Sequence, residues 1–144
     1  MNLLNKIAVA SLVLVTFLAG SSAQAQPAPP LTQVTVYAVS STGHPAWEYP
    51  PTGSLSTRPD QKGPGVWVAV LEVGYANQST RHATFGGSNM TYVTQIAVVN
   101  VFRQVVGYVV VYYYTGKWSS AQFKYTATSL VVPIVARSTQ ILVQ

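Results

Sequence analysis

Apolar and polar residues alternate along much of the chain after residue 30, which is the period of a half-buried β-strand. In Leu31–Ser40, Val34, Val36 and Ala38 fall on one face, while Thr35, Tyr37 and Val39 fall on the other. Many of these residues are β-branched, a shape that packs well on a pleated sheet. The pattern therefore predicts a strand over Leu31–Ser40.

The same reasoning predicts the other strands. They are Val66–Tyr75, Thr91–Phe102 (one strand or a pair), Val105–Thr115, Trp118–Thr128 and a last segment that ends at Ile141–Val143. Gly116-Lys117 is predicted as a hairpin turn between two of them, and Gly86-Gly87 as a turn within a polar segment. After residue 25, apolar residues do not recur at helical spacing. We therefore predict an all-β domain of about six to eight strands, as an antiparallel β-sandwich or a small barrel.

The first 25 residues have the pattern of a cleavable signal peptide. Lys6 precedes an apolar run over Ile7–Leu18, and Ala23-Gln24-Ala25 has the small residues that signal peptidase recognises. The run is shorter than the ~20 residues that span a bilayer, which disfavours a permanent membrane anchor. We expect cleavage between Ala25 and Gln26, followed by a Pro-rich lead over residues 26–30 and one all-β domain over 31–144.

The amino-acid composition restricts the kind of organism and the kind of binding partner that we expect. The chain has no cysteine, which in a small exported domain favours a bacterial protein over a eukaryotic one. In that setting the glycosylation sequons at Asn77 and Asn89 are read as chance matches. The formal net charge is +5, or +4 without Lys6, and the cations are scattered. We expect weak attraction to anionic envelope polymers and no nucleic-acid binding.

Catalytic chemistry has few candidates. The domain offers three acids and two histidines, with no serine elbow between strand and helix and no phosphate loop. We expect no cofactor. A metal site would have to assemble in space from His44, His82, Glu48 and Asp60. The enzyme alternative is a hydrolase that uses Glu72 with His82 or Asp60, and the sequence does not decide whether the protein is an enzyme.

Glu72 lies on the same strand face as Val66, Val68 and Val70. If the valine face is the core, Glu72 is a carboxylate at the end of that core. The preferred interpretation is that the strand leaves the core there, and that Glu72 pairs with an arginine at the surface.

The longest irregular segment is Ser41–Gly65, which contains five of the nine prolines and four glycines. Loops of this length are uncommon in compact domains and are often functional. Trp47 and Tyr49 lie within it, so this loop is the first place to look for a site.

Aromatic residues give the strongest indication of binding. Tyr108, Tyr112 and Tyr114 fall on one face of the strand Val105–Thr115, about 7 Å apart for neighbours at i and i+2. An exposed stripe of this kind would stack on sugar rings or peptide side chains, with Trp47, Tyr49 and Trp118 framing it. The alternative is that a second sheet covers this face. The segment is also uncharged and rich in β-formers, which allows a self-assembling protein as a further reading.

Three segments together carry a resemblance: Leu31–Ser40, Gly65–Tyr75 and Gly107–Tyr112. They resemble small secreted bacterial proteins of the YolA-like type, a domain of unknown function. The resemblance implies an exported bacterial β domain and transfers no active-site residue.

These observations favour an exported bacterial protein, periplasmic or secreted to the medium, that acts as a non-catalytic binding module. The expected ligand is an envelope polysaccharide or a protein surface. The secreted hydrolase and the self-assembling structural protein remain the alternatives.

Overall fold

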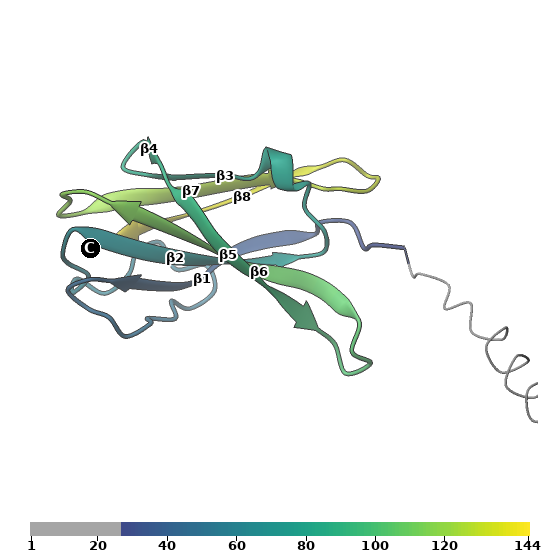
Figure 1. Ribbon diagram of the computed structural model, residues 1–144, viewed down its shortest axis with the longest axis horizontal. Coiled ribbons are helices and arrows are strands. Elements are labelled where there is room, and N and C mark those ends of the chain that lie inside the picture. The colour runs from purple at the N-terminus through teal and green to yellow at the C-terminus, as the bar shows by residue number, and fades with distance from the viewer. Residues whose placement is uncertain (1–26) are drawn as a thin grey trace, which may run out of the picture.

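Eight strands and one short 3-10 turn make up the described part of the chain, residues 27–144 of a computed structural model (Figure 1). The predicted signal peptide and its cleavage site between Ala25 and Gln26 lie outside the described residues. The elements are β1 Gln33–Ser41, β2 Gly65–Val73, η1 Gln78–Thr80, β3 His82–Phe85, β4 Ser88–Asn89, β5 Thr91–Val99, β6 Val105–Thr115, β7 Ala121–Thr128 and β8 Ala136–Val143. No helix within residues 27–144 is long and apolar enough to cross a bilayer.

The strands form two antiparallel four-stranded sheets, with the orders β1-β2-β6-β5 and β4-β3-β7-β8. Figure 1 shows the two sheets as stacked layers, with β5 and β6 running obliquely across the second sheet. The predicted β-sandwich is therefore confirmed.

The core lies between the two sheets. On β2 the valine face is fully buried, with Val66, Val68 and Val70 at 0% exposure. Phe123 and Tyr125 of β7 belong to the same apolar cluster. The sequence left open which face of β2 is the core, and the structure shows that it is the valine face.

Strand β1 shows why simple alternation misplaces one residue. Val36 pairs with Val70 and Ala38 with Ala69, so Tyr37 is an extra residue in a β-bulge. After the bulge the two faces of the strand are exchanged. Val39, which alternation placed on the other face from Val36, is therefore fully buried as well.

The predicted hairpin at Gly116-Lys117 is wrong. β6 pairs with β2 and β5, whereas β7 pairs with β3 and β8 in the other sheet. The segment between β6 and β7 therefore crosses from one sheet to the other. The Gly116 amide donates a hydrogen bond to the Pro64 carbonyl at 2.7 Å, and the chain continues to Trp118, which packs against the core.

The polar segment after β2 contains two strands that the sequence did not predict. β3 has four residues and β4 has two, which is too short for a recognisable alternation. The turn predicted at Gly86-Gly87 is confirmed. It connects β3 and β4, and both glycines have positive φ, at 57° and 84°.

The long loop between β1 and β2 covers one side of the sandwich. Glu48 of the loop exchanges two backbone hydrogen bonds with Val39 of β1. Leu55 and Thr57 of the loop form backbone hydrogen bonds with Leu142 of β8. The edge strands of both sheets on this side thus have partners. On the other side, β5 is the last strand of its sheet.

Candidate functional site

The predicted tyrosine stripe faces the second sheet. Tyr112 is 4% exposed, and Tyr108 and Tyr114 are partly buried against the core. Tyr112 contacts Tyr125 of β7, with ring centroids 5.6 Å apart. The interpretation in which a second sheet covers this face is the one that the structure adopts.

The opposite face of this sheet carries a second aromatic pair. Trp67 of β2 stacks on Tyr113 of β6, with ring centroids 4.5 Å apart and planes inclined by 26°. Leu71, Val109 and Val111 lie on the same face and are half-buried. Both faces of β6 are thus apolar, so alternation alone did not show which one packs inward.

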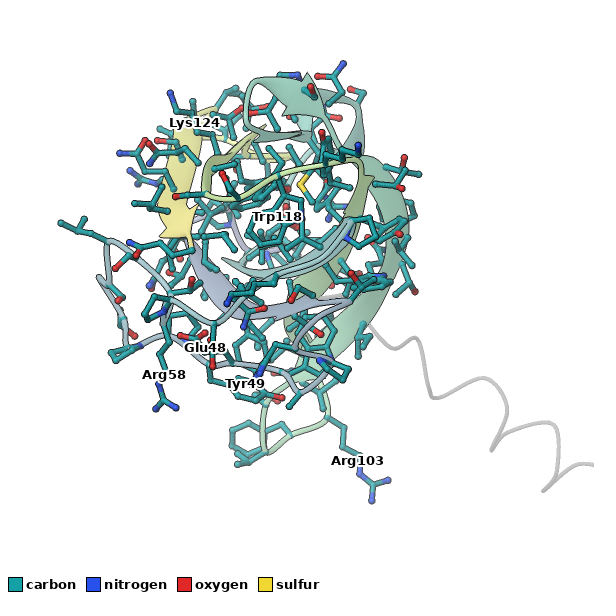
Figure 2. The ribbon with its side chains drawn as sticks, turned by 90° about the vertical axis from the view of Figure 1, so that its left-hand side faces the viewer. Glu48, Tyr49, Arg58, Arg103, Trp118 and Lys124 are labelled. Carbon is teal, nitrogen blue, oxygen red and sulfur yellow. The ribbon has the colours of Figure 1, made fainter. Side chains whose placement is uncertain are left out.

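The three predicted framing residues lie in two places. Trp118 packs edge-on against Phe85, with centroids 5.2 Å apart, and Figure 2 shows it between the two sheets. Trp47 and Tyr49 lie in the long loop and are 41% and 60% exposed. The six predicted binding residues therefore do not form one surface.

Glu72 is completely buried, and its carboxylate is held by two other residues. Arg81 donates from Nε to Oε1 at 3.0 Å and from a terminal nitrogen to Oε2 at 2.5 Å. The Tyr125 hydroxyl donates to Oε1 at 2.5 Å, and Arg81 also donates to Gln95 Oε1 at 2.8 Å. We call these four residues the Glu72 network.

The expected arginine partner exists, but the expected surface location is wrong. The side chains of Arg81 and Glu72 are 6% and 0% exposed. Arg81 follows η1 and enters the sandwich just before β3, so it brings its charge to the end of the valine face. Burial by itself lowers the pKa of Arg81, but the hydrogen bonds and charge of Glu72 outweigh this, and the pKa is raised.

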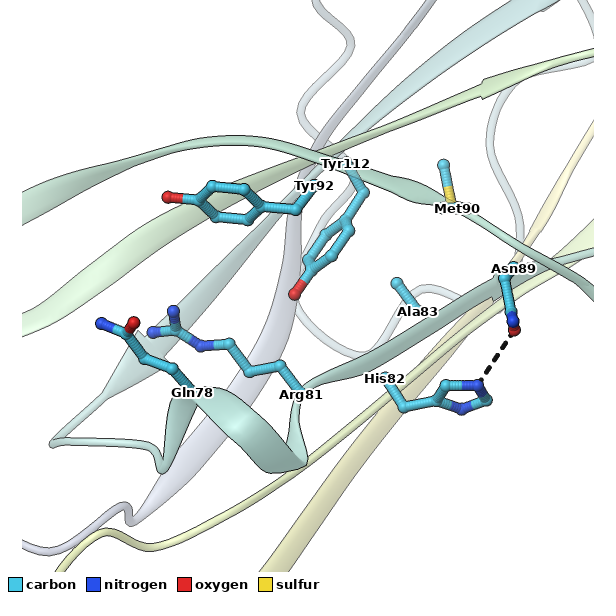
Figure 3. Close-up of a pocket in the computed structure, with 8 residues that line it drawn as sticks. All are labelled: Gln78, Arg81, His82, Ala83, Asn89, Met90, Tyr92 and Tyr112. Atoms are coloured by element: carbon cyan, nitrogen blue, oxygen red, sulfur yellow. Dashed lines mark hydrogen bonds between the residues drawn. The ribbon is translucent and has the colours of Figure 1, made fainter.

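A cavity of about 350 Å³ lies next to this network, between β3 and β5 (Figure 3). Its lining includes Gln78, Arg81, Tyr92 and Tyr112, and in Figure 3 the Tyr112 hydroxyl points toward Arg81. His82 lies at the other end, with Nε2 3.1 Å from Asn89 Oδ1. Sequence reasoning missed Arg81 because it lies in a polar segment without any periodic pattern.

The buried tyrosines predict a loss of stability at alkaline pH. Burial raises the pKa of Tyr125 well above 10.0, and its hydrogen bond to Glu72 raises it further; burial also raises the pKa of Tyr112. Both phenols therefore keep their protons in the folded state when the unfolded chain loses them. The stabilisation is complete below pH ~10 and falls above it, by about 1.4 kcal/mol per pH unit and tyrosine.

Urea unfolding between neutral pH and pH ~11 would measure this slope. In Tyr112→Phe and Tyr125→Phe the slope above pH ~10 should be shallower than in the wild type, whatever each variant does to the stability at neutral pH. A slope that stays unchanged in both variants would contradict the assignment.

The hydrolase alternative required Glu72 to meet His82 or Asp60. Both Glu72 oxygens are instead taken by Arg81 and Tyr125 in a fully buried position. His82 contacts Asn89, and Asp60 lies in the long loop with its Oδ2 3.7 Å from His44 Nδ1. The structure does not bring these groups together for acid–base chemistry.

The four residues from which a metal site would have had to assemble do not come together either. Within residues 27–144, no three histidine, aspartate or glutamate side chains gather closely enough to hold a metal ion. His44, Glu48 and Asp60 do line one pocket, but His82 lies at the cavity beside β3.

The second concave site is a pocket of about 520 Å³ in the long loop, which we call the loop pocket. Aromatic and ionisable side chains line much of it: His44, Trp47, Glu48, Tyr49, Arg58 and Asp60. Figure 2 shows Glu48, Tyr49 and Arg58 near one another on the same side of the molecule, with Arg58 extending outward.

The backbone of the loop pocket is held in place by hydrogen bonds. Glu48 accepts from the Arg58 amide at 2.9 Å and from Gln61 Nε2 at 3.2 Å. Ser41 Oγ accepts from the amides of His44 and Lys62, at 3.1 and 3.0 Å. The loop therefore presents its aromatic rings from a fixed frame although it contains little regular structure.

Comparisons with known proteins place the chain in a family without assigning it an activity. No curated protein and no solved structure matches the chain. A family described as a domain of unknown function, DUF4879, matches residues 26–143, which is most of the chain. The expectation of an uncharacterised-domain family is thus confirmed, and this protein belongs to the DUF4879 family.

Proposed function

We propose that the protein is a non-catalytic binding module and that the loop pocket is its binding site. The proposed ligand is a hydroxyl-rich saccharide within a cell-envelope polysaccharide. The observation that carries this proposal is the exposure of Trp47 and Tyr49 beside fixed polar side chains in one pocket.

The chemistry of the pocket suits a sugar ring. An aromatic face packs against the C–H groups of a sugar, while nearby carboxylate, imidazole and guanidinium groups bond its hydroxyls. Tyr49 also contacts Tyr37 of β1 edge to face, with ring centroids 5.4 Å apart, so the aromatic surface continues beyond the pocket. Covering the sheet edges explains why the loop backbone is fixed, but it does not require exposed aromatic side chains.

The Glu72 cavity supports this function less well. Arg81 is already bound to Glu72 and Gln95, and His82 lies within hydrogen-bond distance of Asn89. A ligand there would have to compete with contacts that stabilise the fold. In the loop pocket, a ligand could pack on Trp47 and Tyr49 without replacing contacts of this kind.

The setting of this function follows from the sequence. The N-terminal pattern favours an exported bacterial protein, and the YolA-like resemblance favours the same setting. An envelope polymer is then a ligand within reach, and the mild positive charge would favour anionic polymers. A protein surface is the other partner that the same aromatic residues would suit.

The double variant Trp47→Ala/Tyr49→Ala is expected to lose binding while it keeps its fold. Each ring contributes about 1 kcal/mol to stacking, so the loss of both, about 2 kcal/mol, should lower the affinity by about 30-fold. The measurement is co-sedimentation of the protein with insoluble polysaccharides and purified cell envelopes, at low and high salt. Stacking is screened little by salt, so binding should survive high salt.

Leu55→Ala is the matched control, because Leu55 is 81% exposed in the same loop but does not line the loop pocket. It should bind like the wild type. If the double variant and the wild type pellet with the polysaccharide to the same extent, the loop pocket is not the binding site. Pelleting that disappears at high salt would assign binding to charge alone.

A further inference from the structure

Within residues 27–144, strand β5 is an edge strand without the usual protection of such strands. Natural proteins keep sheet edges from pairing with other chains by charged side chains, prolines or a covering loop. On the β1 side of the sandwich the long loop covers the edge, through the Val39–Glu48 bridge. Over Thr91–Val99 there is no charged residue and no proline.

Apolar side chains are concentrated on this strand and the turn that follows it. The exposed fractions are 60% for Ile96, 55% for Val99 and 90% for Val101. Tyr92, Val93 and Phe102 are also large, apolar and exposed. Clustered exposure of this kind marks an interaction surface.

The regular part of the edge is short and well defined. Bulges interrupt the pairing of β5 with β6 at Val93 and between Val98 and Val99. Thr94–Val98 remains as five consecutive paired residues, with Ile96 at its centre. A partner strand would have to pair with this segment.

We propose that β5 pairs antiparallel with β5 of a second copy of this chain, about a two-fold axis at Ile96. Ile96 then lies opposite its own copy, and Gln95 lies opposite Ala97. The β1-β2-β6-β5 sheets of the two copies then become one continuous sheet of eight strands.

The charge distribution favours a second copy as the occupant. Arg103 is the only charged residue between His82 and Lys117, so no cation lies on the pairing segment. In an antiparallel pair the two hairpin tips point in opposite directions. Three residues of strand separate Ile96 from Val99, which is ~10 Å, so the two Arg103 residues lie at least ~20 Å apart. That exceeds the ~8 Å screening length of physiological salt.

The arrangement closes as a dimer. A two-fold interface uses the same patch on both copies, and such interfaces do not propagate. The edges of β1 and β8 on the far side are bonded to the long loop. Both loop pockets also lie on that far side, away from the paired strands, so the proposed dimer leaves them open. The proposal does not depend on what the loop pocket binds.

Sedimentation of the purified protein over a wide concentration range tests the pairing. We expect the mass to rise from one chain to two and to stop there. Ile96→Lys places two ammonium groups opposite one another and should leave a monomer at all concentrations. Val101→Lys is the matched control, since Val101 is at least as exposed but lies in the turn, and it should dimerise like the wild type.

Single cysteines test the register, because the chain has none of its own. Directly opposed residues have Cβ atoms ~5 Å apart, close to the spacing that a disulfide needs. Ile96→Cys should therefore form a covalent dimer under mild oxidation, much faster than Val101→Cys. A wild-type monomer at every concentration, growth beyond two chains, a dimeric Ile96→Lys, or equal cross-linking of the two cysteine variants would each overturn the proposal.

Discussion

Replacing Glu72 with glutamine is expected to lower the free energy of unfolding by about 3–5 kcal/mol, because the buried Arg81 charge would lose its counter-ion. The side chain keeps its shape, so packing changes little. What changes is that Arg81, 6% exposed and bonded to both carboxylate oxygens, would face a neutral amide. Urea unfolding at neutral pH measures the loss as a lower midpoint at constant slope.

The matched control for this prediction removes both charges. In Glu72→Gln/Arg81→Gln no unpaired charge remains, and two amides can still bond one another, Gln95 and Tyr125. The double variant should therefore be more stable than Glu72→Gln alone, although it carries one more substitution. If the losses of the two single variants simply add, the two groups are not coupled as the structure indicates.

Replacing Gly74 with alanine is expected to have an effect of similar size, for a steric reason. Gly74 has a φ of +94°, and a Cβ atom there would lie 2.0 Å from the Pro30 carbonyl oxygen. The Gly74 amide donates a hydrogen bond to the Val106 carbonyl at 2.8 Å. The next amide, that of Tyr75, donates one to the Pro29 carbonyl at 2.9 Å. A methyl group would push the lead segment off the end of β2, and we expect a loss above about 3 kcal/mol.

Gly53 separates the steric effect from the conformational one. Its φ is +82°, but a Cβ atom there would meet nothing within 4 Å. Gly53→Ala should therefore show only the ~1–2 kcal/mol that a left-handed backbone costs a residue with a side chain. Equal losses in the two variants, measured by urea unfolding, would show that the contact with Pro30 does not matter.

The tyrosines of β6 show where sequence reasoning about the site stopped. Alternation placed Tyr108, Tyr112 and Tyr114 on one face, and that grouping is correct. The opposite face carries Val109, Val111 and Tyr113, which are equally apolar. Because period-two patterning identifies a buried face by contrast with a polar one, it had no basis for choosing between the two faces.

The long loop shows the opposite case. Its length and its proline content marked it in the sequence as a candidate site, and it does contain a pocket with Trp47 and Tyr49. Its second role, covering the edges of β1 and β8, depends on contacts such as that of Leu55 with Leu142, which lie 87 positions apart in the chain (142 − 55). No local pattern indicates such a contact.

The sequence by itself determined the fold class, because strand formation follows a local period of two residues. The tertiary structure alone decided three other features. It decided that β6 and β7 lie in different sheets, that Glu72 meets Arg81 inside the sandwich, and that β5 is left as an edge. Each of these depends on which strands become neighbours, and that is fixed by the packing of the whole chain, which residues close in sequence do not encode.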